Sequence, residues 1–384
     1  MSTTKVLYKP KNLEIEFGEK DGGYFLRTNE SPTSSETTTT TISSLPSYLT
    51  RGKIIVIDSV NSGIGRSDEK NIYSKIINPL FDHLSIPHEY FPTTSPSSIS
   101  DLALSFKDPE ITVIFISGDT SINEFVNGLN DTTTGKISIF PIPGGTGNSL
   151  ALSLNLTDPL SSISTLLTGK PDPLNLYQVE FPKNTKFLVQ NEVTDEVPAN
   201  FKFLVVLSWA FHASLVADSD TPELRKHGLQ RFQIAAYQNL EREQKYEGQV
   251  IINNDEVING PFAYWLLTSA QKFEPTFEIS PQGDILKDEL YLVAFETKTD
   301  KDYIMDIMKQ VYDKGSHVSN PDVVYKKLVK GDSIVLKTKN SNSVNDKRFC
   351  VDGSIVVLPD TTDNEIRIQV TNNKQYSWEL YIIH

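Results

Sequence analysis

Residues 111–129 read ITVIFIS and then GDTSINEFVNGL, a run of apolar and β-branched residues that passes through a glycine into a helical pattern. The first part is typical of a buried strand, and the second places apolar side chains on one face of a helix. The same succession occurs at residues 53–65 (KIIVIDSVNSGIG) and 137–148 (ISIFPIPGGTGN). Successive units of strand, glycine loop and helix predict an α/β fold with a parallel sheet and helices on both faces.

The second half of the chain has a different pattern. Short β-branched or aromatic segments, bounded by turn residues, dominate after residue 174, with few helical stretches between them. This pattern predicts a mostly antiparallel β-sandwich. We therefore expect an α/β domain at residues 51–174 and a β-sandwich domain at residues 175–384.

Residues 1–50 form an N-terminal extension in this scheme. Residues 31–47 are dominated by Ser and Thr and bury too little apolar surface to offset their ordering, so we expect a flexible linker. The alternating patch NLEIEF at residues 12–17, with a glycine turn after it, predicts a hairpin or a loose appendage. Folded structure is expected to begin near Arg51, so that removal of residues 1–47 leaves the fold intact.

Composition excludes several classes of function. The chain has 36 basic and 49 acidic side chains, a net charge of −13, which disfavours nucleic acid as the main partner. The longest apolar runs, residues 262–267 and 290–295, are far shorter than the roughly 20 residues of a membrane-spanning helix. The N-terminus lacks the apolar core of a secretory signal, and one cysteine, Cys350, gives no intrachain disulfide. A cytoplasmic location is expected.

The glycine loops are the candidate sites for chemistry. Each follows a predicted strand and precedes a helix, where backbone N–H groups and the helix dipole favour an anion such as phosphate. Glycine is also the ordinary residue of a tight turn, so each loop taken alone has that alternative. Asp119 places a carboxylate among these donors, which suits a group that handles Mg²⁺ or accepts a proton; its alternative role is a helix cap.

Four blocks of sequence resemble the diacylglycerol kinase catalytic-domain family, which includes sphingosine and ceramide kinases. Residues 117–129 (SGDTSINEFVNGL) are similar to its SGDGxxxEvvNGL block, and residues 143–154 (PGGTGNSLALSL) to its GTGN block. Residues 207–232 resemble the substrate-side block of the sphingosine kinase branch, and Val351-Asp352-Gly353 resembles the C-terminal VDGE. The blocks occur in the family order, which makes chance a poor explanation.

The resemblance implies a role for individual residues. Asp119 falls where the family has its catalytic acid, and either Asp218 or Asp220 matches the acid that reads the lipid head group. Both aspartates have the alternative of capping the helix that begins at Pro222. Arg225 and Arg231 match two arginines that reach the phosphates, with a surface ion pair to Asp220 or Glu223 as the alternative. The other nucleotide-binding residues implied are Ser62, Gly63, Thr94, Ser117, Gly118, Thr120, Glu124, Gly145, Thr146, Gly147, Asn148 and Gly353.

The chain also departs from the family pattern. The family's Asn-Pro pair after the first strand is absent, and Thr120 stands in place of a glycine. If the backbone there is left-handed, a β-branched residue lowers stability by about 1–2 kcal/mol. If the backbone is right-handed, this strain does not arise. Ser354 replaces the glutamate of VDGE, and Ala210 replaces the glycine of Trp-Gly-Phe, which we take as a small change.

The expected function is an ATP-dependent lipid kinase that uses ATP and Mg²⁺. The preferred substrate is a sphingoid long-chain base, and diacylglycerol or another lipid alcohol is the second choice. A lipid substrate implies transient peripheral contact with intracellular membranes. A homodimer is a possible oligomeric state. The alternative is a catalytically impaired protein that binds nucleotide or lipid, suggested by Thr120 and Ser354. A nicotinamide-nucleotide kinase fits less well because of the arginine block at residues 224–232, and a dinucleotide oxidoreductase lacks a complete G-x-G-x-x-G.

Overall fold

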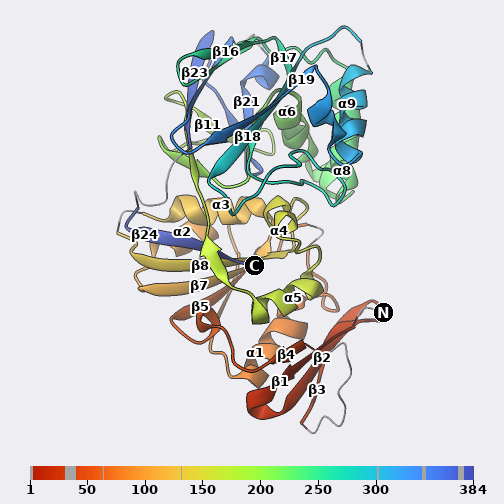
Figure 1. Cartoon of the computed structure of the whole chain (residues 1–384), viewed down its shortest axis with the longest axis vertical. Helices are drawn as coiled ribbons and strands as arrows, with labels where there is room; N and C mark the ends of the chain where they lie inside the picture. Colours follow the sequence, from red (N-terminus) through yellow and green to blue (C-terminus); the bar gives the residue numbers. More distant parts are fainter. Residues whose placement is uncertain are drawn as a thin grey trace. The chain divides into compact units, whose positions relative to one another are not determined.

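The chain divides into two compact units. The computed structural model describes residues 3–30, 40–63, 65–130, 132–300, 302–339, 343–370 and 376–384. Unit 1 comprises Met1–Gly145, Leu154–Leu174 and Tyr376–His384, and unit 2 comprises Thr146–Ser153 and Asn175–Gln375 (Figure 1).

Unit 1 is built on a six-stranded sheet in the order β6-β5-β7-β8-β24-β9. The strands β6, β5, β7, β8 and β24 are parallel to their neighbours, and β9 pairs with β24 in antiparallel fashion. The central residues of β5, β7 and β8 are buried, as expected of strands covered on both faces. The bounds are β5 Lys53–Asp58, β6 Glu89–Pro92, β7 Glu110–Ser117, β8 Gly135–Pro143, β9 Pro171–Pro173 and β24 Trp378–Ile383.

Helices connect these strands. The expected helix after the first glycine loop begins as a π-helical turn, η3 (Tyr73–Ile77), and continues as α1 (Asn78–Leu84) with Pro79 in its first turn. The π-helical turn directly before Pro79 changes the hydrogen-bond pattern at the point where proline lacks an N–H. The remaining helices of unit 1 are α2 (Ser98–Leu104), α3 (Asp119–Gly128) and α5 (Pro159–Thr168).

The C-terminal strand returns to unit 1. The sequence placed residues 376–384 in the second domain, but β24 pairs in parallel with β8 in the first, and Figure 1 shows the blue end of the chain beside β8. Trp378, Leu380 and Ile382 on β24 are buried. An isolated apolar segment carries no local sign of which distant strand it will pair with, so the domain boundary could not be placed there from the sequence.

A second, four-stranded sheet in unit 1 has the order β3-β2-β1-β4. Its strands are β1 (Thr3–Tyr8), β2 (Leu13–Lys20), β3 (Gly23–Asn29) and β4 (Thr40–Ile42), with 3-10 helices η1 (Lys9–Lys11) and η2 (Ser47–Leu49). Val6, Ile15 and Phe17 are completely buried. Folded structure therefore begins well before Arg51, and the hairpin is an integral part of unit 1. Residues 31–39 of the expected linker lie outside the described residues.

Unit 2 is the expected antiparallel sandwich. Its sheets have the orders β12-β11-β22-β21-β14-β17-β18-β19 and β13-β10-β23-β20-β15-β16. Trp209, Trp265 and Phe349 belong to the apolar core cluster that both sheets build. The strands are β10 (Tyr177–Glu180), β11 (Lys186–Val189), β12 (Glu192–Glu196), β13 (Phe201–Phe203), β14 (Val206–Trp209), β15 (Gly248–Ile252), β16 (Glu256–Asn259), β17 (Phe262–Thr268), β18 (Glu289–Glu296), β19 (Val323–Val329), β20 (Ser333–Lys339), β21 (Arg348–Val351), β22 (Ser354–Val357) and β23 (Asp363–Gln369).

The helices of unit 2 carry several of the predicted site residues. Helix α6 packs on β14, β17 and β21 of the eight-stranded sheet and on α8. The helices are α4 (Ser149–Ser153), α6 (Ala210–Ser219), α7 (Pro222–Arg225), α8 (Gln230–Leu240), α9 (Tyr303–Tyr312), η4 (Ser316–Ser319) and η5 (Val344–Lys347). In the part of the chain that the structure describes, no helix is both long and apolar enough to cross a bilayer.

Candidate active site

The glycine loops of unit 1 meet at one edge of the parallel sheet. Because β6, β5, β7 and β8 run in the same direction, the loops that follow them lie at their common carboxyl edge. This edge brings together the predicted residues Ser62, Gly63, Thr94, Ser117, Gly118, Asp119, Thr120, Glu124 and Gly145. The expectation that the loops share an edge is confirmed.

Two of the loops pack so closely that glycine is required. Gly63 has a left-handed backbone with φ of +63°, and a Cβ there would lie 2.9 Å from the carbonyl oxygen of Gly144. A Cβ on Gly144 would lie 3.2 Å from the backbone nitrogen of Ser117. The Gly144 N–H also donates to the Ser117 carbonyl at 3.0 Å. These contacts fix the first and third loops against the end of β7.

Arg66 joins the ends of neighbouring strands. Its guanidinium donates from Nε to Asp58 Oδ1 at 3.0 Å and from Nη2 to the carbonyls of Ser59 at 3.1 Å and Ile116 at 2.9 Å. Asp58 is completely buried at the end of β5, and the Arg66 side chain is only 13% exposed. Nη2 also donates to Ser62 Oγ at 3.2 Å. One buried cation therefore holds the ends of β5 and β7 and the first glycine loop.

Sequence reasoning missed Arg66, its buried partner Asp58, and Tyr90, which also contacts Asp58. Ser62 Oγ continues the connection by donating to the Gly144 carbonyl at 3.1 Å, and Tyr90 on β6 donates to the second oxygen of Asp58 at 3.1 Å. The signal in the sequence was an arginine directly after the turn SGIG, with an aspartate ending the preceding strand. The pairing itself depends on how the loop folds back, which spacing does not reveal.

Helix α3 begins with the predicted catalytic acid. Gly118 is its N-cap residue and Asp119 its first helical residue. Thr120 lies in the same right-handed helix, and its φ is not positive. The left-handed strain considered for it therefore does not arise. An acidic residue in the first turn interacts favourably with the helix dipole.

Glu124 lies one turn further along α3. Burial raises the pKa of its carboxyl group to about 7. A carboxyl group with that pKa is partly protonated at neutral pH and can donate as well as accept a hydrogen bond. Ionisable groups with a shifted pKa are common at functional sites.

Thr94 lies at the same edge, and the third glycine loop runs from Gly145 of unit 1 into unit 2. The backbone N–H of Thr94 donates to Ser98 Oγ at 3.1 Å, which places the residue at the start of α2. Asn148 accepts a hydrogen bond from Leu152 through its carbonyl and so leads into α4. A Cβ on Gly147 would meet nothing within 4 Å. Thr146, Gly147 and Asn148 belong to unit 2, whereas Gly145 ends the first segment of unit 1.

In unit 2, both predicted phosphate-binding arginines contact Asp220. Arg225 makes a two-pronged pair with it, from Nε at 2.9 Å and Nη2 at 3.1 Å, and Arg231 Nη1 lies 3.3 Å from Oδ1. The ion pair considered for these arginines is therefore present. Burial lowers the pKa of Arg231, and its Nε is a buried donor with no partner among the described residues.

Asp218 is held by a different set of partners. Arg348 Nη1 donates to Asp218 Oδ1 at 2.6 Å, and Asn239 Nδ2 donates to Oδ2 at 2.9 Å. Neither Asp218 nor Asp220 is the N-cap of α7, because Thr221 takes that position and accepts from the Leu224 N–H. The capping alternative is thus replaced by ion pairs for both aspartates.

The Val351-Asp352-Gly353 block forms the turn between β21 and β22. Asp352 is buried and accepts from the backbone N–H groups of Leu204, Val205 and Val206 at 2.7 to 2.8 Å. Gly353 has φ of +92°, a conformation that favours glycine. The aspartate therefore holds the chain between β13 and β14, and Ser354 begins β22.

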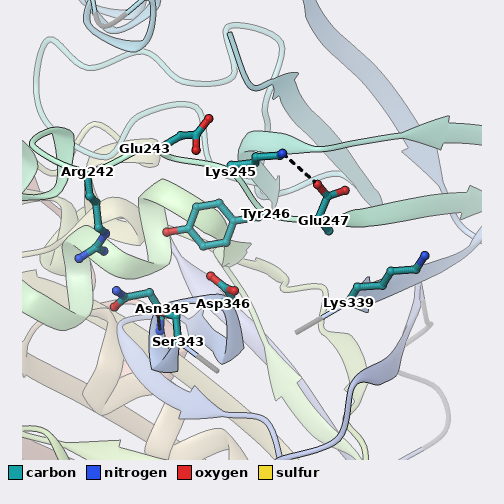
Figure 2. A pocket seen from close by; sticks show the side chains of 9 residues that line it. All are labelled: Arg242, Glu243, Lys245, Tyr246, Glu247, Lys339, Ser343, Asn345 and Asp346. Carbon is teal, nitrogen blue, oxygen red and sulfur yellow. Dashed lines mark hydrogen bonds and ion pairs between the residues drawn. The ribbon is translucent and has the colours of Figure 1, made fainter. Parts of the chain in front are cut away.

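A separate cavity of about 360 Å³ lies in unit 2 between the connection from α8 to β15, the end of β20 and η5 (Figure 2). Lys245 and Glu247 on its rim form an ion pair with 3.5 Å between Nζ and Oε1. The predicted site residues do not line it. Its charged side chains are balanced in sign: Arg242, Lys245 and Lys339 against Glu243, Glu247 and Asp346.

Comparison with known proteins places the glycine loops in a family. The family model of the diacylglycerol kinase catalytic domain matches residues 53–179. Sphingosine kinase B of Dictyostelium discoideum is 34% identical over 131 residues, which are 33% of this chain and 17% of that protein. The chain thus matches a small part of the length of that curated relative.

Solved structures share the fold at low sequence identity. A crystal structure of a diacylglycerol kinase from Bacillus anthracis str. Sterne is 15% identical, with a TM-score of 0.51, and covers 85% of this chain and 96% of that one. A second structure from the same strain has a TM-score of 0.57 at the same identity and coverage. Residues 53–179 are therefore similar to a diacylglycerol kinase catalytic domain and include sequence similar to sphingosine kinase B, and the solved structures share the fold.

Proposed function

We propose that the chain is an ATP-dependent lipid kinase that phosphorylates a hydroxyl group of a sphingoid long-chain base. The observation that carries the proposal is that Arg66 joins the end of β7 to the loop after β5 and, through Ser62, to the loop after β8, within the segment that matches the diacylglycerol kinase catalytic-domain model. The choice of a long-chain base rests on the similarity to sphingosine kinase B and on the block at residues 207–232. Diacylglycerol or another lipid alcohol is the alternative acceptor.

The loops at the carboxyl edge of unit 1 would hold the phosphates of ATP. Backbone N–H groups in glycine loops and at a helix N-terminus suit phosphate oxygens, and α3 begins at this edge. The tight contacts of Gly63 and Gly144 leave the loops without side chains that would cover their backbone. These features support the nucleotide role of the residues inferred from the sequence.

Asp119 is the proposed proton acceptor. The oxygen of the lipid hydroxyl attacks the γ-phosphorus, and the bond from that phosphorus to the bridging oxygen breaks, so that ADP leaves with the bonding electrons. The hydroxyl proton passes to the Asp119 carboxylate. Phosphoryl transfer depends mainly on positioning and charge neutralisation, so few protein groups are needed.

Mg²⁺ fits this site without a preformed cage. No cluster of three or more His, Cys, Asp or Glu side chains that could hold a metal occurs among the described residues. In phosphoryl transfer, Mg²⁺ is usually held by one or two carboxylates together with phosphate oxygens and water. Asp119, at the start of α3, is the carboxylate that would hold it, and the ion would neutralise phosphate charge.

Arg225 and Arg231 would add cationic contacts to the phosphates. Asp220 orients both guanidinium groups, and the buried Nε of Arg231 remains as a donor without a partner among the described residues. A buried unpaired donor costs about 1–3 kcal/mol, a cost that an anionic ligand would remove. We propose that a phosphate oxygen accepts from this Nε.

A lipid acceptor also requires contact with a membrane surface. Leu229 and Tyr237, at the N-cap and on the outer side of α8, are 54% and 64% exposed. Large apolar side chains exposed on one helix support transient peripheral binding of unit 2 to membranes.

The decisive experiment incubates the purified chain with labelled ATP, Mg²⁺ and a panel of lipid alcohols, and follows transfer of label to lipid. We expect transfer to a long-chain base, reduced about 10²–10⁴-fold in Asp119→Asn with ATP binding retained. Transfer of label to diacylglycerol alone would replace the long-chain base with diacylglycerol as the proposed substrate. ATP binding with no transfer to any lipid would replace the proposal with an impaired, nucleotide-binding protein, for which Ser354 in place of the family glutamate is the supporting feature.

A further inference from the structure

The chain segment that follows Arg66 lies along the edge of the N-terminal sheet. Strand β3 is the outermost strand of that sheet, so alternate N–H groups face away from β2. The Tyr24 N–H uses this free side to donate to the Glu69 carbonyl at 2.8 Å. Gly23 also approaches this segment, because a Cβ there would lie 3.4 Å from the same carbonyl oxygen. Glu69 is three residues beyond Arg66.

Charged groups link the same two segments. Lys70 Nζ lies 2.7 Å from Glu19 Oε1 on β2, and Glu19 is the cross-strand partner of Tyr24. Burial raises the pKa of Tyr24, and the nearby cations Lys70 and Arg66 act in the opposite direction. Arg66 is thus within electrostatic reach of the sheet. An exposed ion pair adds little stability, but it fixes which residues of the two segments face each other.

The other end of the same crossover is also tied to the sheet. Lys11, at the end of η1, donates from Nζ to the His83 carbonyl at 2.7 Å and to Ser85 Oγ at 2.8 Å. Ser85 is the left-handed C-cap of α1. Between these two ends, β3 packs on η3. The N-terminal sheet therefore holds the first strand-to-strand crossover of unit 1 at its beginning and at its end (Figure 1).

We propose that the N-terminal sheet is a positioning element of the nucleotide site, which holds the crossover at residues 67–85 so that Arg66 stays across the ends of β5 and β7. The inference rests on the proposed function, since it takes the loops that Arg66 joins as the phosphate site. In this role the backbone N–H of Tyr24 acts through Glu69 and Arg66, without contact to the nucleotide. Loss of the hydrogen bond frees the loop that carries Arg66, and the ordering of that loop must then be supplied on ATP binding.

The test removes this one N–H and keeps the β2–β3 ladder. Tyr24→Pro removes the donor on the outer edge of β3, where proline is tolerated. Tyr24→Ala removes the ring and keeps the donor. Thr28→Pro is the matched control, because Thr28 lies four residues along the same strand, is exposed, and its N–H faces the same outer side by the period of two.

We expect the Kd for ATP to rise at least fivefold in Tyr24→Pro relative to Tyr24→Ala, and to change less than twofold in Thr28→Pro. Amide hydrogen exchange should speed up at residues 59–71 in Tyr24→Pro, while the central strands β5 and β7 keep their protection. Equal Kd values and equal exchange in Tyr24→Pro and Tyr24→Ala would overturn the inference.

A second pair of variants covers failure of Tyr24→Pro to fold. Lys11→Met removes the two hydrogen bonds to the end of α1, and Lys9→Met removes the same charge from an exposed position of the same turn. Weaker ATP binding in Lys11→Met alone, restored by Lys11→Arg, supports the inference, and equal binding in both lysine variants overturns it. If the unaltered chain does not bind ATP, the proposed function fails, and the exchange at residues 59–71 still decides whether the sheet holds the loop.

Discussion

The strain at Ala210 is visible only in its backbone conformation. The residue begins α6 with φ of +61°, and it stands where the similar motif has glycine. The replacement of glycine by alanine, small in volume, is therefore a strained one, since a Cβ in the left-handed region costs about 1–2 kcal/mol. The same strain was one of the two alternatives for Thr120, whose helical backbone carries none of it.

We predict that Ala210→Gly raises the free energy of unfolding by about 1 kcal/mol, because relief of strain exceeds the extra entropy of glycine in the unfolded chain. Urea unfolding measures the change. Ala213→Gly, at a buried position of the same helix with no positive φ, is the control and should lower stability by about 1 kcal/mol. A loss of stability in both variants would contradict the strain.

Glu124 should make the unliganded protein less stable as pH rises. Its pKa is raised by burial from 4.5 to about 7. Between these values the unfolded chain ionises while the folded chain keeps its proton, so stability falls with rising pH and the full cost, up to about 3 kcal/mol, is present above pH 7. In Glu124→Gln this fall should vanish. Denaturant unfolding at pH 5 and pH 8 checks it, and an equal fall in both proteins would exclude Glu124 as the cause.

At the scale of elements, the N-terminal sheet changes what residues 1–50 do. The sequence indicated a removable extension, whereas β1 and β2 supply buried side chains to unit 1, and β1 and β4 pack on α5. Apolar alternation over six residues predicts a strand but not the surface that it covers. The docking surface is formed by helices far along the chain, so tertiary structure alone decides whether such a hairpin is loose or integral.

We predict that Phe17→Ala lowers the free energy of unfolding of unit 1 by about 3–5 kcal/mol, the range for a large apolar side chain removed from a core. Phe17 is fully buried on β2. Glu14→Ala, on the opposite face of the same strand, is the control and should change stability by less than about 0.5 kcal/mol. Unfolding followed by a probe in unit 1 measures both. Equal, small effects would restore the interpretation of a loose extension.

At the scale of the whole molecule, residues with a proposed role toward ATP occur in each of the two units. The loops around Arg66 and Asp119 belong to unit 1, and Arg225 and Arg231 belong to unit 2. Each unit has its own core. A unit that binds ATP should be stabilised by it, because a ligand that binds only the folded state adds about 2.7 kcal/mol at a concentration of 100 times its Kd.

We predict that Arg231→Lys raises the Kd for ATP about tenfold, since lysine keeps the charge and loses the planar fork. The unfolding midpoint without ATP should change little. Arg367→Lys on β23, where the arginine side chain is 59% exposed, is the control and should leave the Kd unchanged. Titration calorimetry gives both values. An unchanged Kd in Arg231→Lys would leave the residue with the Asp220 ion pair as its whole role.

The sequence alone determined the fold class, the family resemblance and the shared edge of the glycine loops. These follow from local patterns, because strand and helix periodicity and glycine spacing act over a few residues, and parallel strands necessarily bring their loops to one edge. The right-handed backbone of Thr120 was one of the two options that the sequence left open.

The tertiary structure alone decided the partners of charged side chains and the pairing of distant strands. Arg66 with Asp58, Arg348 with Asp218, and β24 with β8 join groups whose neighbours are set by the path of the chain. A buried charge must find an opposite charge or a set of carbonyls, but sequence spacing does not say which one lies within 3 Å. For that reason the sequence predicted which types of residue carry the site, whereas their contacts could be read only from the folded chain.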